Sequence, residues 1–169
     1  APRLIGRDAD EIEAIWKSLF FATHATAVGA ITALALATID TALWDLRGRL
    51  EGKPVTALLG GTPGILRTYA SSMKRDITPA AEAERFLRLR DAHGFDAFKF
   101  RVGAECGHDI DEWPGRTEAI VPAMRRAMGP DITLMVDANS CYGPKRAIEV
   151  GRILEDNGIS HYEEPCPYW

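Results

Sequence analysis

Residues 133–139, TLMVDAN, form a strand-like run that ends in an acid and an amide. Residues 160–164, SHYEE, form a second strand-like run with acids at its end, and one helical run separates the two. Strands that follow one another through a helix lie side by side and parallel, about 4.8 Å apart. We therefore expect the side chains of Asp137 and Glu163 to converge at the same end of one sheet.

The same alternation of strand and helix extends along the chain from residue 67. Prolines stand at or next to the start of each helical run and glycines follow its end, as at Pro79 and Gly94. The expected strands are 67–71, 97–102, 133–139 and 160–164, and the expected helices are 79–93, 115–128 and 144–157. Repeated βαβ units predict an α/β fold with a parallel sheet, either a barrel or a doubly wound sheet. In both architectures the active site lies in the loops that follow the strands.

The chain before residue 60 has a helical pattern. A helix is expected over 8–21, where Asp8 and Glu11 have the spacing of a capping box. A second helix is expected over 29–51, with an apolar stripe from Ile39 to Leu50 and Gly52 at its end.

The segment 60–66, GGTPGIL, is the best boundary in the chain. It divides a helical part, 1–60, from a strand-and-helix part, 67–169. Because the chain begins with Ala and stops just after a strand that no helix covers, we expect it to be a piece of a longer protein.

Composition excludes some classes of partner. The 169 residues are 46% hydrophobic and 26% charged with a net charge of −4, so no basic excess attracts nucleic acid or an anionic membrane surface. The longest apolar stretch is too short to span a bilayer. Three cysteines at unrelated spacings, without a CxxC motif, indicate reduced thiols in a cytoplasmic protein.

Charged side chains gather on one face of the expected strands. Because side chains alternate along a strand, Lys99 and Arg101 share one face, as do Asp137 and Asn139. Glu163 then faces the same site from the next strand. Carboxylates without neighbouring Cys or His in their motifs favour a hard divalent cation, Mg²⁺ before Zn²⁺.

Simpler interpretations exist for each of these residues. Asp137 and Glu163 can cap the following helices or pair with surface arginines. Lys99 and Arg101 can form structural ion pairs with the same carboxylates. Two acids at corresponding positions of adjacent strands, facing a Lys-x-Arg pair, favour a site over capping. By the same alternation Glu164 is expected to point away as a structural acid.

Five short motifs occur together in one order. They resemble those of the enolase superfamily, in its mandelate racemase and muconate lactonizing enzyme branch. The motifs are Ile39-Asp40-Thr41-Ala42-Leu43-Trp44-Asp45-Leu46, Pro54 through Gly61, Phe98-Lys99-Phe100-Arg101-Val102-Gly103, Val136-Asp137-Ala138-Asn139 and Tyr162-Glu163-Glu164-Pro165. The resemblance implies an α+β capping domain, of which 1–60 would be the helical part. It also implies a TIM-type (β/α)₇β barrel, of which 67–169 would be the first four strands.

The resemblance also implies roles for site residues. Asp137 and Glu163 would be the first two of three Mg²⁺ ligands, and Asn139 and Lys99 would contact the substrate carboxylate. The third ligand and the usual His-Asp catalytic pair would belong to later strands.

One position departs from the branch, which typically carries Lys-x-Lys with the second Lys as a base. That position is Arg101 here, and a guanidinium is a poor base because it stays protonated. We expect Arg101 to stabilise negative charge and to depress the pKa of Lys99 by like-charge repulsion. Either Lys99 or a His of a later strand would then be the base.

The implied chemistry is Mg²⁺-dependent abstraction of the proton α to a carboxylate. Dehydration of a sugar acid, the reaction of a hydro-lyase, is favoured because the family that the chain resembles includes many acid-sugar dehydratases and because the polar loops 71–76 and 104–113 can bind hydroxyl groups. Racemisation or epimerisation comes second and cycloisomerisation third. The isolated chain can also be an inert fragment or a binding module. The expected partner is a small carboxylate, and the full-length protein is expected to be a homo-oligomer.

Overall fold

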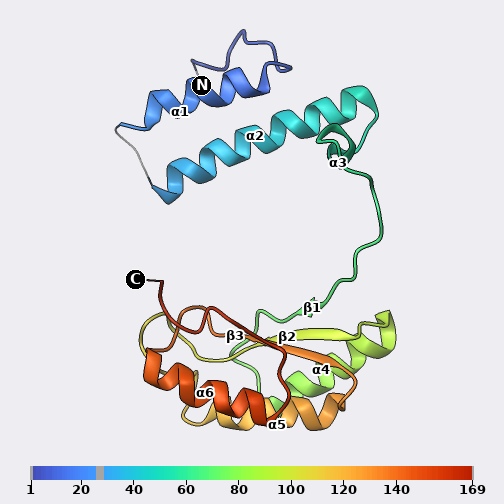
Figure 1. Cartoon of the computed structure of the whole chain (residues 1–169), viewed down its shortest axis with the longest axis vertical. Coiled ribbons are helices and arrows are strands. Elements are labelled where there is room, and N and C mark those ends of the chain that lie inside the picture. Colours follow the sequence, from blue (N-terminus) through green and yellow to red (C-terminus); the bar gives the residue numbers. More distant parts are fainter. Residues whose placement is uncertain (1, 26–28, 169) are drawn as a thin grey trace. The chain divides into compact units, whose positions relative to one another are not determined.

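A computed structural model of the protein describes residues 2–25 and 29–168. The chain divides into two compact units, residues 1–66 and residues 67–169 (Figure 1). No helix in the described ranges is both long and apolar enough to cross a membrane. All three cysteines are free thiols, as expected.

The first unit is helical. Its helices are α1 (Ile12–Thr23), α2 (Ala30–Glu51) and α3 (Val55–Leu58). The expected capping box does not form: α1 begins only at Ile12, and the Asp8 carboxylate accepts a hydrogen bond from the Asp10 N–H in the preceding turn, at 3.0 Å. Helix α2 ends as expected at Gly52, whose left-handed backbone (φ 63°) stops the helix. Its apolar stripe is only partly covered within this unit, because Leu50 is exposed.

The second unit is a parallel sheet with helices. Its elements are β1 (Ala70–Ser71), α4 (Pro79–His93), β2 (Ala97–Arg101), α5 (Arg116–Met128), β3 (Thr133–Asp137), α6 (Pro144–Asp156) and β4 (His161–Glu163). The strands pair in chain order, β1-β2-β3-β4, and the three long helices lie on one side of the sheet (Figure 1). A doubly wound sheet reverses its strand order and carries helices on both faces, so this arrangement is that of a barrel.

Strand β1 is shorter than the expected 67–71. Only Ala70 and Ser71 pair with β2, opposite Phe98 and Lys99. Because β2 itself begins at Ala97, the residues before Tyr69 have no strand residue opposite them. The other elements of this unit lie within two residues of their expected bounds.

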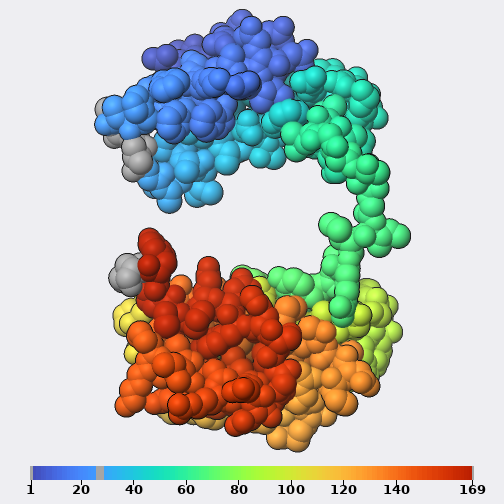
Figure 2. All heavy atoms as spheres, viewed as in Figure 1, coloured from blue at the N-terminus to red at the C-terminus, as the bar shows by residue number. Residues whose placement is uncertain are grey.

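The core lies between the sheet and its helices. Phe98 and Phe100 of β2, with Leu134 and Val136 of β3, are fully buried on that side. Phe86 of α4 stacks on Phe98 at 4.8 Å between ring centroids. Figure 2 shows α6 and residues 164–168, in orange to red, on the viewed face of this unit. Because side chains alternate along a strand, the other residues of β2 and β3, including the charged ones, lie on the face of the sheet that points away from the helices.

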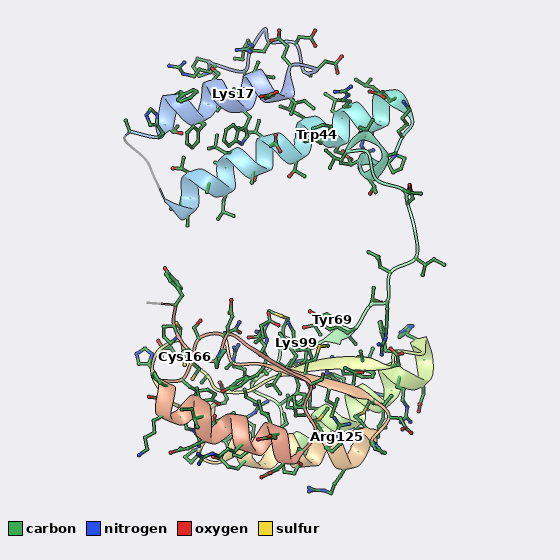
Figure 3. The ribbon with its side chains drawn as sticks, in the orientation of Figure 1. Lys17, Trp44, Tyr69, Lys99, Arg125 and Cys166 are labelled. Carbon is green, nitrogen blue, oxygen red and sulfur yellow. The ribbon has the colours of Figure 1, made fainter. Side chains whose placement is uncertain are left out.

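At the amino end of the sheet, where the strands begin, a single arginine connects several main-chain segments. The Arg125 guanidinium of α5 donates hydrogen bonds of 2.7–2.9 Å to four main-chain carbonyls, those of Gly129, Ile132, Asn157 and Gly158. These carbonyls lie at the end of α5, before β3 and after α6. Arg125 lies on the helix side of the sheet, as Figure 3 shows.

Candidate active site

The carboxyl end of the sheet, where β2, β3 and β4 finish, carries one row of charged residues. Arg101 is paired in register with Asp137, and Asp137 with Glu163. The three side chains thus leave the sheet on the same face, and Lys99 lies one step earlier on that face. As expected, the two acids converge on adjacent strands beside the Lys-x-Arg pair.

The row is held together by ion pairs. Lys99 pairs with Glu163 and Arg101 with Asp137, and the Lys99 Nζ also lies 3.8 Å from the Asp137 Oδ2. The side chains of Lys99, Arg101 and Asp137 are almost fully buried, whereas that of Glu163 is 34% exposed. The ion pairs expected if Lys99 and Arg101 are structural residues are therefore present. The site is also open to solvent through the Glu163 side chain.

The pKa of Lys99 departs from the sequence expectation. Burial lowers the pKa of Lys99, but its hydrogen bonds and charge interactions with Glu163 and Tyr69 outweigh burial, so the net pKa is raised. The expected lowering of the Lys99 pKa by Arg101 is wrong, because the Lys99 ammonium is paired with the Glu163 carboxylate. The same hydrogen bond from Lys99 lowers the pKa of Glu163 below its usual value.

Asn139 connects several groups of this site. Its main-chain N–H donates to the Asp137 Oδ1 at 2.8 Å, and its backbone is left-handed, with φ 44°. Its side-chain Oδ1 accepts hydrogen bonds from both Arg75 and Arg101. Its Nδ2 lies 3.4 Å from the Glu164 Oε2. The amide expected beside the acids is thus in place.

The orientation expected for Glu164 is wrong. Strand β4 ends at Glu163, and the left-handed backbone of Glu164 (φ 44°) breaks the alternation of side chains, which brings its carboxylate to Asn139. The carbonyl of Glu164 also accepts a hydrogen bond from the Ser140 N–H, at 2.7 Å. The ends of β3 and β4 are therefore joined through both backbone and side chains.

Loop 104–113 lies against the loop that follows β3. The Gly107 N–H donates to the Ser140 carbonyl at 2.8 Å, and the Asp109 carboxylate accepts from the Gly143 N–H at 2.5 Å. The loop is held at the carboxyl end, where the sequence predicts substrate contacts. Those contacts remain a prediction.

Three residues near the row were not identified individually from the sequence. The Tyr69 ring lies 5.3 Å from the Lys99 Nζ, and the two residues appear together in Figure 3. The Met73 Sδ accepts from Arg101 at 2.9 Å, and Arg75 reaches Asn139. Tyr69 was detectable, since by alternation from Ser71 it shares the face of Lys99. Met73 and Arg75 lie in a loop without periodic signal.

The chemistry of the acids fits part of a Mg²⁺ site. Asp137 and Glu163 offer carboxylate oxygens from adjacent strands, which are ligands that a hard cation prefers. Within residues 2–25 and 29–168, no group of three or more His, Cys, Asp or Glu side chains is placed to hold a metal ion. The two acids therefore make an incomplete ligand set.

Comparison with known proteins agrees with these features. The family described as mandelate racemase / muconate lactonizing enzyme, N-terminal domain, matches residues 1–60, and the family described as enolase C-terminal domain-like matches residues 81–169. The chain is 35% identical to D-galactarolactone cycloisomerase of Agrobacterium fabrum and covers 42% of that protein. It is 33% identical to arabinonate dehydratase of Saccharolobus solfataricus and again covers 42%. These alignments include 96% and 97% of this chain, which thus spans less than half the length of these relatives.

Solved structures give the same result. The crystal structure of a candidate racemase from Roseobacter denitrificans matches 100% of this chain and 46% of its own, with a TM-score of 0.89 and 56% identity. A mandelate racemase/muconate lactonizing protein from Paracoccus denitrificans, complexed with magnesium, matches 99% of this chain and 45% of its own, with a TM-score of 0.86 and 33% identity.

The parallel sheet is accordingly part of a TIM-type (β/α)₇β barrel, and the first unit is the helical part of an α+β capping domain. The chain belongs to the mandelate racemase and muconate lactonizing enzyme branch of the enolase superfamily.

Proposed function

We propose that the intact protein removes the proton α to the carboxylate of a sugar acid and eliminates the β-hydroxyl group as water. The observation that carries the proposal is the row of Asp137 and Glu163 in register on adjacent strands, with Lys99 and Arg101 beside them. The dehydratase and cycloisomerase names of the relatives support a substrate of this class.

Asp137 and Glu163 are the residues that we assign to a Mg²⁺ ion, and a structural neighbour is described as a magnesium complex. When bound, the ion would neutralise the charge that builds up on the substrate carboxylate as the α-proton leaves. Lys99 and Arg101, which pair with these acids in this structure, would then be available to substrate oxygens.

The remaining roles follow from the charge of each group. Lys99 and Asn139 donate hydrogen bonds to the substrate carboxylate. Arg101 supplies a permanent positive charge in a buried position, where an electrostatic interaction is stronger than in water. Breaking the α C–H bond gives an enediolate, and loss of the β-hydroxyl with a proton gives an enol, which tautomerises to an α-keto acid. Lys99 is the group of this row that can exchange a proton, but its pairing with Glu163 raises its pKa. It would therefore act as the base only when Glu163 binds a cation instead, and a His of a later strand is the alternative base.

Cycloisomerisation is the second candidate, because a relative with 35% identity carries that name. The first step is the same, but a ring oxygen leaves the β-carbon in place of a hydroxyl group. Racemisation requires proton transfer on both faces of the α-carbon, and Arg101 is a poor base for one of them.

The test is to incubate the intact protein with aldonic and aldaric acids, and separately with their lactones, in D₂O with Mg²⁺. Dehydration converts an open-chain acid to an α-keto acid with loss of water, cycloisomerisation converts a lactone to an α-keto acid without loss of water, and racemisation gives an α-deuterated acid without loss of water. Asp137→Asn should abolish turnover and weaken Mg²⁺ binding with the fold intact. Turnover that survives in Asp137→Asn would refute the metal assignment. Lys99→Met and Arg101→Met, measured by α-proton exchange, then locate the base.

A further inference from the structure

Arg75 joins the loop after β1 to the end of β3. From the segment between β1 and α4, its guanidinium Nη2 donates to the Asn139 Oδ1, 64 positions away in the chain. Arg75 is half-buried, and its Nε is shielded from solvent without a hydrogen-bond partner among the described residues. The Arg75 side chain is thus committed to one contact at the carboxyl end.

The contact determines which atom of Asn139 can meet a substrate. An amide oxygen has two lone pairs, and the Asn139 Oδ1 accepts from Arg75 and from Arg101. Nδ2 carries two hydrogens, of which one can be directed to the Glu164 carboxylate 3.4 Å away. The second hydrogen remains for an acceptor such as a carboxylate oxygen. With only one guanidinium bound, the amide could turn about its Cβ–Cγ bond, because that bond has a broad torsional preference.

The same residue also orients the acid of β3. The Asn139 main-chain N–H binds the Asp137 Oδ1 at 2.8 Å, while the Asp137 Oδ2 faces Lys99 and Arg101. A left-handed backbone is uncommon at a residue other than glycine, although asparagine adopts it more readily than most, and it persists only where its surroundings hold it. Arg75 is one of the groups that hold Asn139 in this conformation.

We propose that Arg75 is a positioning residue, which fixes the Asn139 amide with Nδ2 presented to the substrate carboxylate. The proposal rests on the proposed function for its chemical meaning. Arg75 need not touch the substrate: it acts through Asn139, together with Arg101.

A first measurement needs no substrate. In the intact protein with ¹⁵N-labelled asparagine, the side-chain amide signal of Asn139 is identified by its loss in Asn139→Gly, a change that the left-handed backbone accepts. Arg75→Met should shift this signal and speed its hydrogen exchange with water. Arg88→Met removes an exposed arginine of α4 that pairs with Glu84 on the same helix, so it should leave the signal unchanged. An Asn139 signal that is the same in Arg75→Met and in the unaltered protein would overturn the proposal.

A double-mutant cycle on turnover gives the second measurement. Arg75→Met should lower kcat about tenfold to hundredfold, because a charge-assisted hydrogen bond is lost at the site. The same change should have less than about a twofold effect in the Asn139→Gly background, since two residues that act through one contact are not additive. An equal loss in both backgrounds would show that Arg75 does not act through Asn139.

Arg75→Lys is a second variant that tests the proposal even if Arg75→Met does not fold. A lysine keeps the charge and one donor, so it should recover part of the lost kcat and part of the amide shift. Arg88→Met should change kcat less than about twofold. If no acid is turned over by the unaltered protein, the proposed function fails while the amide measurement still decides the role of Arg75.

Discussion

The two ends of the parallel sheet use charged side chains in different ways. At the amino end, one guanidinium, that of Arg125, binds four main-chain carbonyls. At the carboxyl end, Lys99 and Arg101 bind the side chains of Asp137 and Glu163. Main-chain carbonyls are fixed and have no alternative role, whereas carboxylates can exchange one cation for another. The comparison predicts that changes at the amino end reduce stability and changes at the carboxyl end reduce activity, a division typical of barrel enzymes.

Among the changes that compare the two ends, Glu163→Gln should give the largest effect and should act on activity. We expect kcat/KM to fall roughly a thousandfold, about 4 kcal/mol in barrier height, because a proposed metal ligand loses its charge. The Lys99 ammonium keeps Asp137 within 3.8 Å, so no buried charge is left without a partner. Thermal unfolding should therefore change little. A large drop in melting temperature would show that the pair is structural.

Arg125→Met tests the amino end. Loss of four hydrogen bonds from a charged donor should lower the free energy of unfolding by about 2–4 kcal/mol, measured by urea denaturation. The kcat per folded molecule should remain the same. Arg125→Lys, with a single point charge, should lose nearly as much stability. The division between the ends would not hold if kcat fell as steeply as stability.

Gly103→Ala probes the backbone at the carboxyl end. Gly103 has a left-handed φ of 65°, and an added Cβ would lie 2.7 Å from the Cys141 Cβ. We expect a loss of about 2–3 kcal/mol in unfolding free energy, with a decrease in kcat because loop 104–113 must move. The matched control is Gly94→Ala, where φ is 70° and nothing lies within 4 Å of the added Cβ. Only backbone strain applies at Gly94, so equal losses at the two glycines would exclude the contact with Cys141.

Thr78→Ala should have the smallest effect. The Thr78 hydroxyl accepts a hydrogen bond from the Ala81 N–H at the start of α4, at 3.3 Å. Its loss should cost about 1 kcal/mol of stability with no change in kcat. Thr78→Ser keeps the cap and should retain full stability in the same denaturation experiment.

Much of the second unit was predictable from its sequence. Prolines and glycines fix where helices begin and end, as at Pro79 and Gly94, and the alternation of side chains along a strand placed Phe98 and Phe100 opposite Lys99 and Arg101. These signals are local, so a single sequence carries them.

The errors arose where local rules no longer apply. The spacing of Asp8 and Glu11 imitated a capping box, but the turn before α1 uses the Asp8 carboxylate. Alternation failed at Glu164 because its backbone leaves the extended region. The Arg75 contact joins segments 64 positions apart and has no spacing signal at all.

The left-handed residues at the carboxyl end have a practical consequence. Every non-glycine residue with positive φ in the described part of the chain lies in a loop that follows β2, β3 or β4; these residues are Asp109, Asn139, Ser140 and Glu164. A protein engineer who screens for heat resistance should recover glycine at Ser140 and Glu164, since glycine adopts this backbone without strain. At Asp109 and Asn139 a glycine would also lose side-chain hydrogen bonds, so less is gained there. Such variants would gain thermal stability and lose turnover, so the most heat-resistant variants of a library should be among those with the lowest kcat.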